Sequence, residues 1–429
     1  MAKEISIFWF RRDLRVEDNK ALSEALRSGN EVLPIFIFDT NITSDLEEED
    51  PRITFIHVCL NQINNRFKDK ESGVLCLQGN PIDVLGNLID KYNIKQVFTN
   101  EDYEPYAIKR DKEIESFLKE KGIQFKLFKD QVVFAKEEIV KDDGSPYTVF
   151  TPFKKKWLKK LTEDVSVLKE NSIDYSGLKK EKFEMPSLSE IGFRESNIKV
   201  KPYKLEALSS YEETRNFPYK DTTSYLSPHL RFGTISIREL VNNFKSNEVF
   251  LSELIWREFF MQILYHFPRV VDENFRKKYD GINWRNNENE FEKWKKGETG
   301  YPLVDAGMRQ LNQTGYMHNR VRMVVASFLC KHLLIDWRLG EAYFAKKLLD
   351  YELSSNNGNW QWAAGTGCDA APYFRVFNPS EQLKKFDKSG EYIRKWISDF
   401  DSFNYPTPMV DHKDARQRAL KVYKEGILD

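Results

Sequence analysis

The sequence predicts two folded regions of different class: an α/β unit with a parallel, doubly wound sheet over residues 1–130, and a mostly helical region over residues 201–429. Three observations support this division. A chain of 429 residues has room for two or three domains and a large core. Short apolar runs alternate with helical patterns up to residue 130, as in doubly wound folds. Residues 131–200 are rich in Lys and Glu and are predicted to be a connector.

In the first region, the apolar runs have the length and composition of buried strands, and helical patterns lie between them. The predicted strands are Ile5–Phe10, Val32–Phe38, Val74–Leu77, Gln96–Thr99 and Phe125–Phe128. The predicted helices are Asn19–Arg27, Ile53–Phe67, Pro81–Tyr92 and Ala107–Lys121. Neither GxGxxG nor GxxxxGK[ST] is present, so a phosphate-binding loop is not indicated. We expect Arg11, Arg12, Asp13 and Arg15 to tie the first strand to its neighbours by ion pairs.

Composition narrows the function classes. Lys+Arg and Asp+Glu are both 66, so no overall positive charge indicates nucleic acid, and any DNA site must be a local patch. The four cysteines form no CxxC pair and no metal-ligand spacing with histidine, which predicts a reduced compartment and no metal site. Charges interrupt the N-terminal apolar run, and no stretch approaches the length of a membrane span. We therefore expect a cytoplasmic protein without a membrane segment, and a monomer.

The segment Asp350–Pro379, DYELSSNNGNWQWAAGTGCDAAPYFRVFNP, stands out. A helix turns about 100° per residue, so Trp360 and Trp362 would point to roughly opposite sides. Asn356 and Trp360 would share a face, although Gly358 makes a regular helix uncertain. One tryptophan could then face the core while the other faces a cavity. The alternative is a Trp-rich core helix that ends in a glycine turn.

Three further segments hold candidate sites. The segment Tyr211–Ser227, YEETRNFPYKDTTSYLS, ends in hydroxyls at a predicted helix start, which suits an anion or an ordinary N-cap run. In Leu251–Pro268, Glu253, Trp256 and Arg257 lie on one helix face. That face suits either a surface ion pair beside a half-buried indole or a pocket for an extruded base. In Gly300–Leu329, the side chains that share one face are Asn319, Arg322 and Met323.

These segments, together with FWFRRDLRVEDNKAL at Phe8–Leu22, closely resemble the photolyase/cryptochrome family, and within it the class I cyclobutane pyrimidine dimer photolyases. The resemblance extends over nearly the whole chain. It implies a Rossmann-like antenna domain, a connector and an all-helical FAD-binding domain. The implied activity is light-driven repair: reduced, anionic FAD transfers an electron to a pyrimidine dimer that has been flipped out of DNA, and the cyclobutane ring opens.

The resemblance also assigns residues. It places FAD contacts at Tyr211, Thr223, Ser224, Leu226, Ser227, Asn319, Arg322, Asp350, Glu352 and Asn356, with Arg322 and Asp350 paired and Asn356 facing flavin N5. It places the lesion against Glu253, Trp256, Met323 and Trp362. It assigns an electron relay to Trp360, Trp337 and Trp284, and DNA contacts to Arg215, Arg257, Arg320, Arg375 and Gln382. His318 is expected to be structural.

Two sets of residues bear on the antenna chromophore and on the choice between repair and photoreception. The polar pair that binds a pterin antenna in some relatives aligns with Tyr106 and Ala107, which lack a carboxylate. A deazaflavin, another flavin, or no antenna chromophore all remain open. Asn356 stands where plant cryptochromes have Asp and animal ones Cys, and it can stabilise a reduced flavin without adding a second negative charge. This favours repair over a cryptochrome-like photoreceptor, which is the alternative function.

Overall fold

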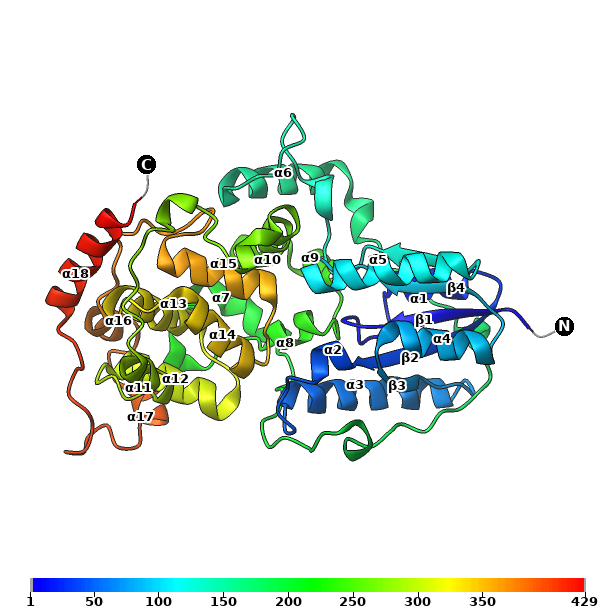
Figure 1. The fold of residues 1–429 in the computed structure, drawn as a ribbon, viewed down its shortest axis with the longest axis horizontal. Coiled ribbons are helices and arrows are strands. Elements are labelled where there is room, and N and C mark those ends of the chain that lie inside the picture. The colour runs from blue at the N-terminus through cyan, green and yellow to red at the C-terminus, as the bar shows by residue number, and fades with distance from the viewer. Residues whose placement is uncertain (1–2, 428–429) are drawn as a thin grey trace. The chain divides into compact units, whose positions relative to one another are not determined.

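The computed structural model describes residues 3–427 and divides into two compact units (Figure 1). Unit 1 comprises the described residues up to Ile139, together with Lys156–Lys201 and Leu226–Leu251. Unit 2 comprises Val140–Lys155, Pro202–Tyr225 and the described residues from Ser252 onwards. Unit 1 contains the α/β fold, and unit 2 is helical.

Unit 1 is built on a five-stranded parallel sheet with the order β3-β2-β1-β4-β5. Its strands are β1 (Ile5–Phe10), β2 (Glu31–Asp39), β3 (Leu75–Gly79), β4 (Ile94–Asn100) and β5 (Gln124–Phe128). The chain builds outward from β1 to β3, then crosses to the other side of β1 for β4 and β5. This is the predicted doubly wound sheet, and all five predicted strands are present.

Helices cover both faces of this sheet, because each strand of the buried centre is apolar on both sides. Helices α1 (Lys20–Leu26) and α3 (Pro51–Lys68) pack on one face, and α4 (Pro81–Lys91) and α5 (Pro105–Glu120) pack on the other. The last three begin with proline, whose missing N–H is not needed in the first turn. Unit 1 also contains α2 (Thr40–Thr43), α8 (Leu226–Arg231), α9 (Ile237–Phe244) and the part of α6 (Phe150–Glu163) from Lys156 onwards.

The basic residues after β1 form ion pairs, as the sequence predicts. Arg11 lies 2.6 Å from Asp111, and Arg12 lies 3.0 Å from Asp102. Asp13 accepts hydrogen bonds from the Arg11 backbone N–H and from Asn100. These contacts fix the carboxyl end of β1 against the chain that follows β4.

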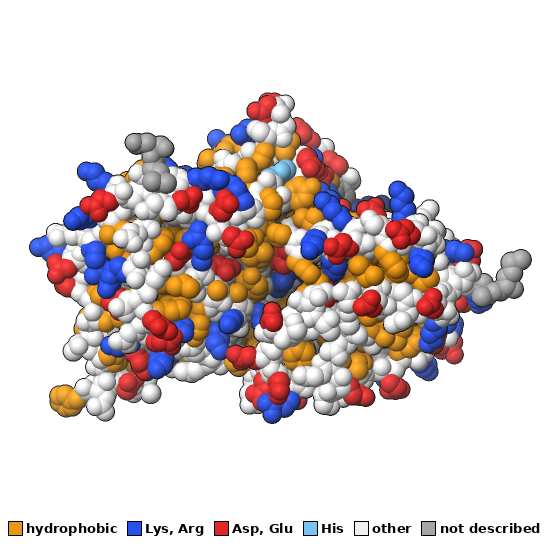
Figure 2. All heavy atoms as spheres, viewed as in Figure 1, with side chains coloured by type: hydrophobic (Ala, Val, Ile, Leu, Met, Phe, Trp, Pro, Cys, Tyr) orange, Lys and Arg blue, Asp and Glu red, His pale blue; other side chains and the backbone are white. Residues whose placement is uncertain are grey.

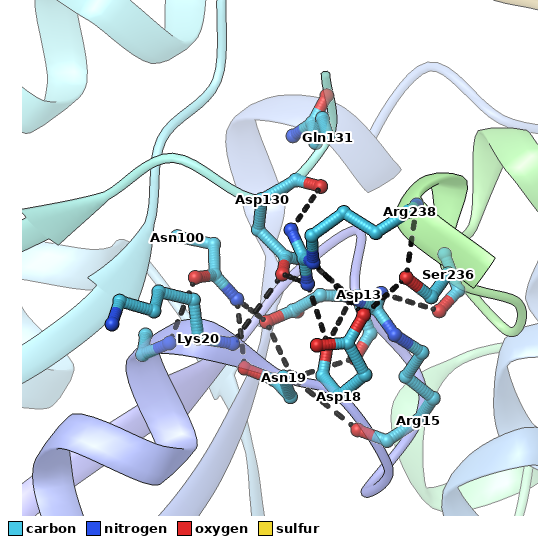
Figure 3. Close-up of polar contacts among 12 residues, drawn as sticks. Asp13, Arg15, Asp18, Asn19, Lys20, Asn100, Asp130, Gln131, Ser236 and Arg238 are labelled. Atoms are coloured by element: carbon cyan, nitrogen blue, oxygen red, sulfur yellow. Dashed lines mark hydrogen bonds and ion pairs between the residues drawn. The ribbon is translucent and has the colours of Figure 1, made fainter. Parts of the chain in front are cut away.

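A buried charged network attaches residues 226–251 to the sheet (Figure 3). The guanidinium of Arg238 donates to Asp18 at 2.9 Å and to Asp130 at 2.7 Å. Arg15 donates to the second oxygen of Asp130 at 2.7 Å, and Ser236 donates to Asp18. Removal of one partner would leave a buried charge uncompensated. The network therefore holds α9 in one position relative to the rest of unit 1.

Unit 2 is helical throughout its ordered elements and surrounds one large apolar core. Its helices are α7 (Tyr211–Thr214), α10 (Glu248–His266, whose first turn belongs to unit 1), α11 (Glu288–Lys296), α12 (Pro302–Thr314), α13 (Asn319–Ser327), α14 (Trp337–Lys347), α15 (Leu353–Ala364), α16 (Pro379–Phe386), α17 (Glu391–Trp396) and α18 (His412–Glu425). A turn of π-helix, Phe328–His332, follows α13.

Gly358 does not break α15, which runs without interruption from Leu353 to Ala364. The glycine is required by packing, since a Cβ at this position would lie 2.2 Å from Cδ1 of Phe260 on α10. It therefore lets α10 and α15 approach closely at Phe260 and Gly358.

Candidate active site

One face of α10 brings Glu253 to a cationic partner. Its carboxylate lies 2.7 Å from the guanidinium of Arg215, and the Glu253 side chain is 34% exposed. The same guanidinium covers the ring of Tyr211, at 5.1 Å from the ring centroid. Burial, together with the charge of Glu253, raises the pKa of Tyr211 to about 12, so its hydroxyl stays protonated. The simpler of the two predictions from the sequence is an ion pair between Glu253 and Arg257, both on α10. In the structure Glu253 pairs with Arg215, and Arg257 pairs with Glu352.

Trp256, one turn further along α10, is held by three phenylalanines. Phe150 stacks on the indole with ring centroids 3.7 Å apart and planes 8° from parallel. Phe259 contacts it edge-on and Phe260 at a tilt. Because Phe150 lies parallel to one face of the indole, only the opposite face can stack on another planar group.

Two ion pairs connect three helices around the start of α15. Arg322 on α13 donates to Asp350 at 2.8 Å, which confirms the predicted pairing. Nε of Arg257 lies 3.6 Å from Glu352, which is buried. The second oxygen of Asp350, Oδ1, is buried and accepts no hydrogen bond from any residue that the structure describes. A buried carboxylate oxygen is seldom left unpaired, so this atom points to a missing donor.

The two tryptophans of α15 differ in environment as their helix phase predicts. Trp360 is 2% exposed and packs in the core against Phe344 and Trp294, with centroids 4.9 and 6.2 Å away. Trp362 is only partly buried and packs on the rim of that core.

Asn356 lies one turn before Trp360 and is buried. Its Nδ2 donates to the carboxylate of Glu341 at 2.8 Å and to the Glu341 carbonyl at 3.1 Å. Burial raises the pKa of Glu341 above its ordinary value. With Nδ2 fixed in this way, Oδ1 of Asn356 remains available as an acceptor, since no described residue donates to it.

The remaining predicted FAD contacts fall in two places. Thr223 and Ser224 are half-buried, and their hydroxyls make no hydrogen bond to any residue between 3 and 427. Leu226 and Ser227 begin α8, which belongs to unit 1. Asn319 is exposed at the first turn of α13.

Helix α13 begins at a histidine cap. Nδ1 of His318 accepts from the Arg320 backbone N–H. Burial and the nearby guanidinium of Arg320 lower the pKa of His318 to about 4, so it is neutral at pH 7 and acts as a cap. The Arg320 guanidinium stacks on Phe386 at 4.5 Å and lies near the sulfur of Met323, at 3.7 Å.

The other relay candidates lie in separate environments. Trp337 is fully buried at the start of α14, and its indole N–H donates to Asn274 at 2.9 Å. Trp284 is half-buried and contacts Tyr423 edge-on at 5.8 Å. The tryptophan in ring contact with Trp360 is Trp294, which the sequence prediction did not include.

The predicted DNA contacts include exposed groups. Arg375 is exposed on the loop after α15, beside the 60% exposed Phe374, and Gln382 is half-exposed on α16. Figure 2 shows acidic and basic side chains interspersed over the visible surface. Among residues 3–427 there is no group of three or more His, Cys, Asp or Glu side chains arranged to hold a metal ion. None of the described helices is long and apolar enough to cross a membrane.

Comparison with known proteins identifies the family. Residues 6–170 match the DNA photolyase domain, and residues 250–404 match the FAD binding domain of DNA photolyase. A deoxyribodipyrimidine photo-lyase from Synechococcus sp. is 35% identical, over 97% of this chain and 95% of the relative. The chain belongs to the DNA photolyase family.

Solved structures of photolyases share the fold over their whole length. A class III photolyase from Agrobacterium tumefaciens superposes with a TM-score of 0.86 at 33% identity, covering 99% of this chain and 98% of the other. An archaeal photolyase from Sulfolobus tokodaii, solved with two FAD molecules, gives a TM-score of 0.85 at 36% identity, covering 98% and 100%.

Three residues that contact predicted site residues were not among those that the sequence analysis predicted: Phe150, Glu341 and Trp294. Each acts through a contact with a residue far away along the chain, such as Phe150 with Trp256. A phenylalanine before a lysine run, or a glutamate in the middle of a helix, is an ordinary feature of a sequence. No local signal would have identified them.

Proposed function

We propose that this protein is a light-driven deoxyribodipyrimidine photo-lyase: it binds DNA that contains pyrimidine dimers and splits the cyclobutane ring. The observation that supports this most strongly is the Glu253–Trp256 face of α10 in a chain that is 35% identical, along nearly its full length, to a deoxyribodipyrimidine photo-lyase. A carboxylate beside a stacking ring is what recognition of an extruded base requires.

FAD is the cofactor, and the residues present fit it. When bound and reduced, FAD supplies a photoexcitable electron donor. We propose that Tyr211, Thr223, Ser224, Leu226, Ser227, Asn319, Arg322, Asp350, Glu352 and Asn356 hold it. The unpaired Asp350 Oδ1 supplies an acceptor for a flavin donor group. The free Oδ1 of Asn356 supplies another, suited to the N–H that a reduced flavin carries at N5, and Glu341 fixes its direction.

The lesion would occupy the space between the two partly exposed tryptophans. Trp256 and Trp362 would stack on it, Met323 would pack against it, and Glu253, in its protonated form, would donate a hydrogen bond to a base carbonyl and so stabilise the negative charge that develops there. In the free protein Glu253 is paired with Arg215. Binding of DNA would break this ion pair, and Arg215 would then contact a DNA phosphate.

The other DNA contacts would be local, in keeping with the zero net charge. Arg257, Arg320, Arg375 and Gln382 would contact the DNA around the extruded dimer. Trp360, Trp337 and Trp284 would pass electrons from the protein surface to oxidised FAD. We further propose that the enzyme acts as a cytoplasmic monomer and without a metal ion.

Within the family, we place the chain with class I, because the lesion-pocket residues Glu253, Trp256, Met323 and Trp362 follow the class I pattern. The class III photolyase from Agrobacterium tumefaciens also shares the fold, with a TM-score of 0.86, so the similarity of fold does not separate class I from class III. A second, light-harvesting chromophore would lie in unit 1 at the carboxyl ends of β1 and β4, where the strand order reverses. Tyr106 follows β4 and donates to Asp39 at the end of β2 at 2.6 Å, and neither Tyr106 nor Ala107 carries the carboxylate that would contact a pterin there.

Replacement of Glu253 tests the assignment. Glu253→Ala removes a hydrogen bond to a base carbonyl of the dimer, so affinity for dimer-containing DNA should fall about tenfold, and light-driven repair should fall with it. FAD should stay bound, because Glu253 is not among the proposed FAD contacts. The matched control is Glu248→Ala, the same change at an exposed position on the same helix. Equal repair by Glu253→Ala and Glu248→Ala would contradict the proposed role.

A further inference from the structure

Phe150 contacts Trp256, one of the two tryptophans that would enclose a lesion, and its backbone is hydrogen-bonded to Asp369, which follows the helix that carries the other. It lies at the start of α6 and is 7% exposed. Its ring stacks on Trp256, with ring centroids 3.7 Å apart and ring planes 8° from parallel. Its backbone N–H donates to Oδ2 of Asp369 at 2.9 Å. The first N–H groups of a helix have no partner within the helix, and this carboxylate supplies one.

Asp369 follows closely after the turn that ends α15. Gly365 ends that helix in the left-handed conformation, with a φ of +90°. The N–H groups of Gly365, Thr366 and Gly367 all donate to the carbonyl of Gln361, at 2.9 to 3.1 Å. The turn is tight, since a Cβ on Gly367 would lie 3.2 Å from the Gln361 backbone. Gln361 directly precedes Trp362, so the turn that leads to Asp369 is anchored beside that tryptophan.

We propose that Phe150 and Asp369 form a brace that sets the orientation of Trp256 relative to Trp362, and that this brace determines how strongly the pocket prefers a pyrimidine dimer to normal DNA. Phe150 is a positioning residue: it covers one face of the Trp256 indole and leaves a single face for the lesion. This inference rests on the proposed function. It adds a determinant of substrate selectivity that lies outside the residues that touch the substrate.

The brace explains two features together. Among its ring contacts, Trp256 has one parallel partner, Phe150, on one face of the indole. Phe259 contacts it edge-on, and Phe260 contacts it at a tilt. The anchoring ring comes from residues 140–155, which pack with unit 2 although the following turns of α6 pack with unit 1. A stacked ring resists rotation of the indole about its side-chain bonds, so the free face keeps one direction before DNA arrives.

The test uses the full-length, FAD-containing protein with Phe150→Leu, and Phe153→Leu as the matched control. Phe153 is also buried on the same helix, but its ring contacts are with Phe259 and Tyr147, and none with Trp256 is found among the described residues. The measurements, in the dark, are Kd for an oligonucleotide with one thymine dimer and Kd for the same oligonucleotide undamaged. Phe150→Leu should raise the first about tenfold and leave the second unchanged. Phe150→Trp, which restores a stacking ring, should recover most of the loss, whereas Phe153→Leu should change neither Kd.

A second variant tests the same proposal if Phe150→Leu does not fold. Asp369→Ala removes the anchor while retaining the Phe150 ring, and it should raise Kd for the damaged oligonucleotide several-fold, whereas Asp369→Asn, which still offers an oxygen acceptor, should not. Equal Kd values for the wild type, Phe150→Leu and Asp369→Ala on damaged DNA would overturn the brace and leave the proposed function intact. No preference of the wild type for damaged DNA would overturn both.

Discussion

At the scale of single residues, Trp360 and Trp362 show how a helix separates two tasks over a spacing of two. Trp360 is enclosed by Phe344 and Trp294, while Trp362 is partly exposed at the rim of the core. A buried indole is shielded from water and suits electron transfer, whereas a partly exposed indole can stack on a ligand. This division follows from the 100° turn per residue and is visible in the sequence.

The assignment of Trp360 to the relay gives a residue-level prediction. Trp360→Phe should abolish fast photoreduction of oxidised FAD, because phenylalanine is not oxidised at accessible potentials, while chemically reduced enzyme should still repair dimers. Trp294→Phe is the control: it changes the buried tryptophan that touches Trp360 without changing the proposed path through Trp337. The readout is flavin absorbance under illumination. If Trp294→Phe blocks photoreduction and Trp360→Phe does not, the path is wrong.

The side chains that share a helix face were predictable, because this depends on spacing within one helix. Their contacts with residues far away along the chain were not. The faces that hold Glu253 with Trp256, or Asn319 with Met323, follow from i, i+3 and i+4 positions. The partner of Glu253, which is Arg215, and the support of Asn356, which is Glu341, come from other segments. Such contacts are fixed by tertiary packing, which the local pattern does not encode.

At the scale of elements, α15 depends on a glycine that the sequence alone made suspect. A glycine inside a helix costs about 1 kcal/mol relative to alanine, so Gly358 reads as a weak point. The structure shows the opposite requirement, because the Phe260 ring occupies the place of a Cβ. Helix propensity is overridden here by the close approach of α10 and α15.

This gives a paired stability prediction. Gly358→Ala should lower the free energy of unfolding by about 1–3 kcal/mol, since the new methyl group would collide with Phe260. Gly86→Ala makes the same change inside α4, where the nearest atom is 3.7 Å away, and it should raise stability by about 0.5–1 kcal/mol. Urea unfolding followed by circular dichroism measures both. Equal effects of the same sign would show that propensity, and not packing, governs position 358.

At the scale of the whole molecule, the order of folded regions was predictable and their exact membership was not. Alternation of strands and helices predicted the parallel sheet, and all five strands were located. Residues 226–251 nevertheless pack with the α/β unit, although they follow the hydroxyl cluster in a helical stretch. Buried ion pairs from Arg238 to Asp18 and Asp130 fix them there, and no sequence pattern links residues more than a hundred positions apart (Figure 3).

The central claim is that this photolyase splits pyrimidine dimers with light. The most direct measurement is the yield of restored thymines when purified, pre-reduced protein and dimer-containing DNA are illuminated with blue or near-ultraviolet light, against an identical sample kept in the dark. The account predicts repair in the illuminated sample and none in the dark. No repair in either sample, from protein that holds FAD and photoreduces it, would contradict the account and indicate a photoreceptor instead.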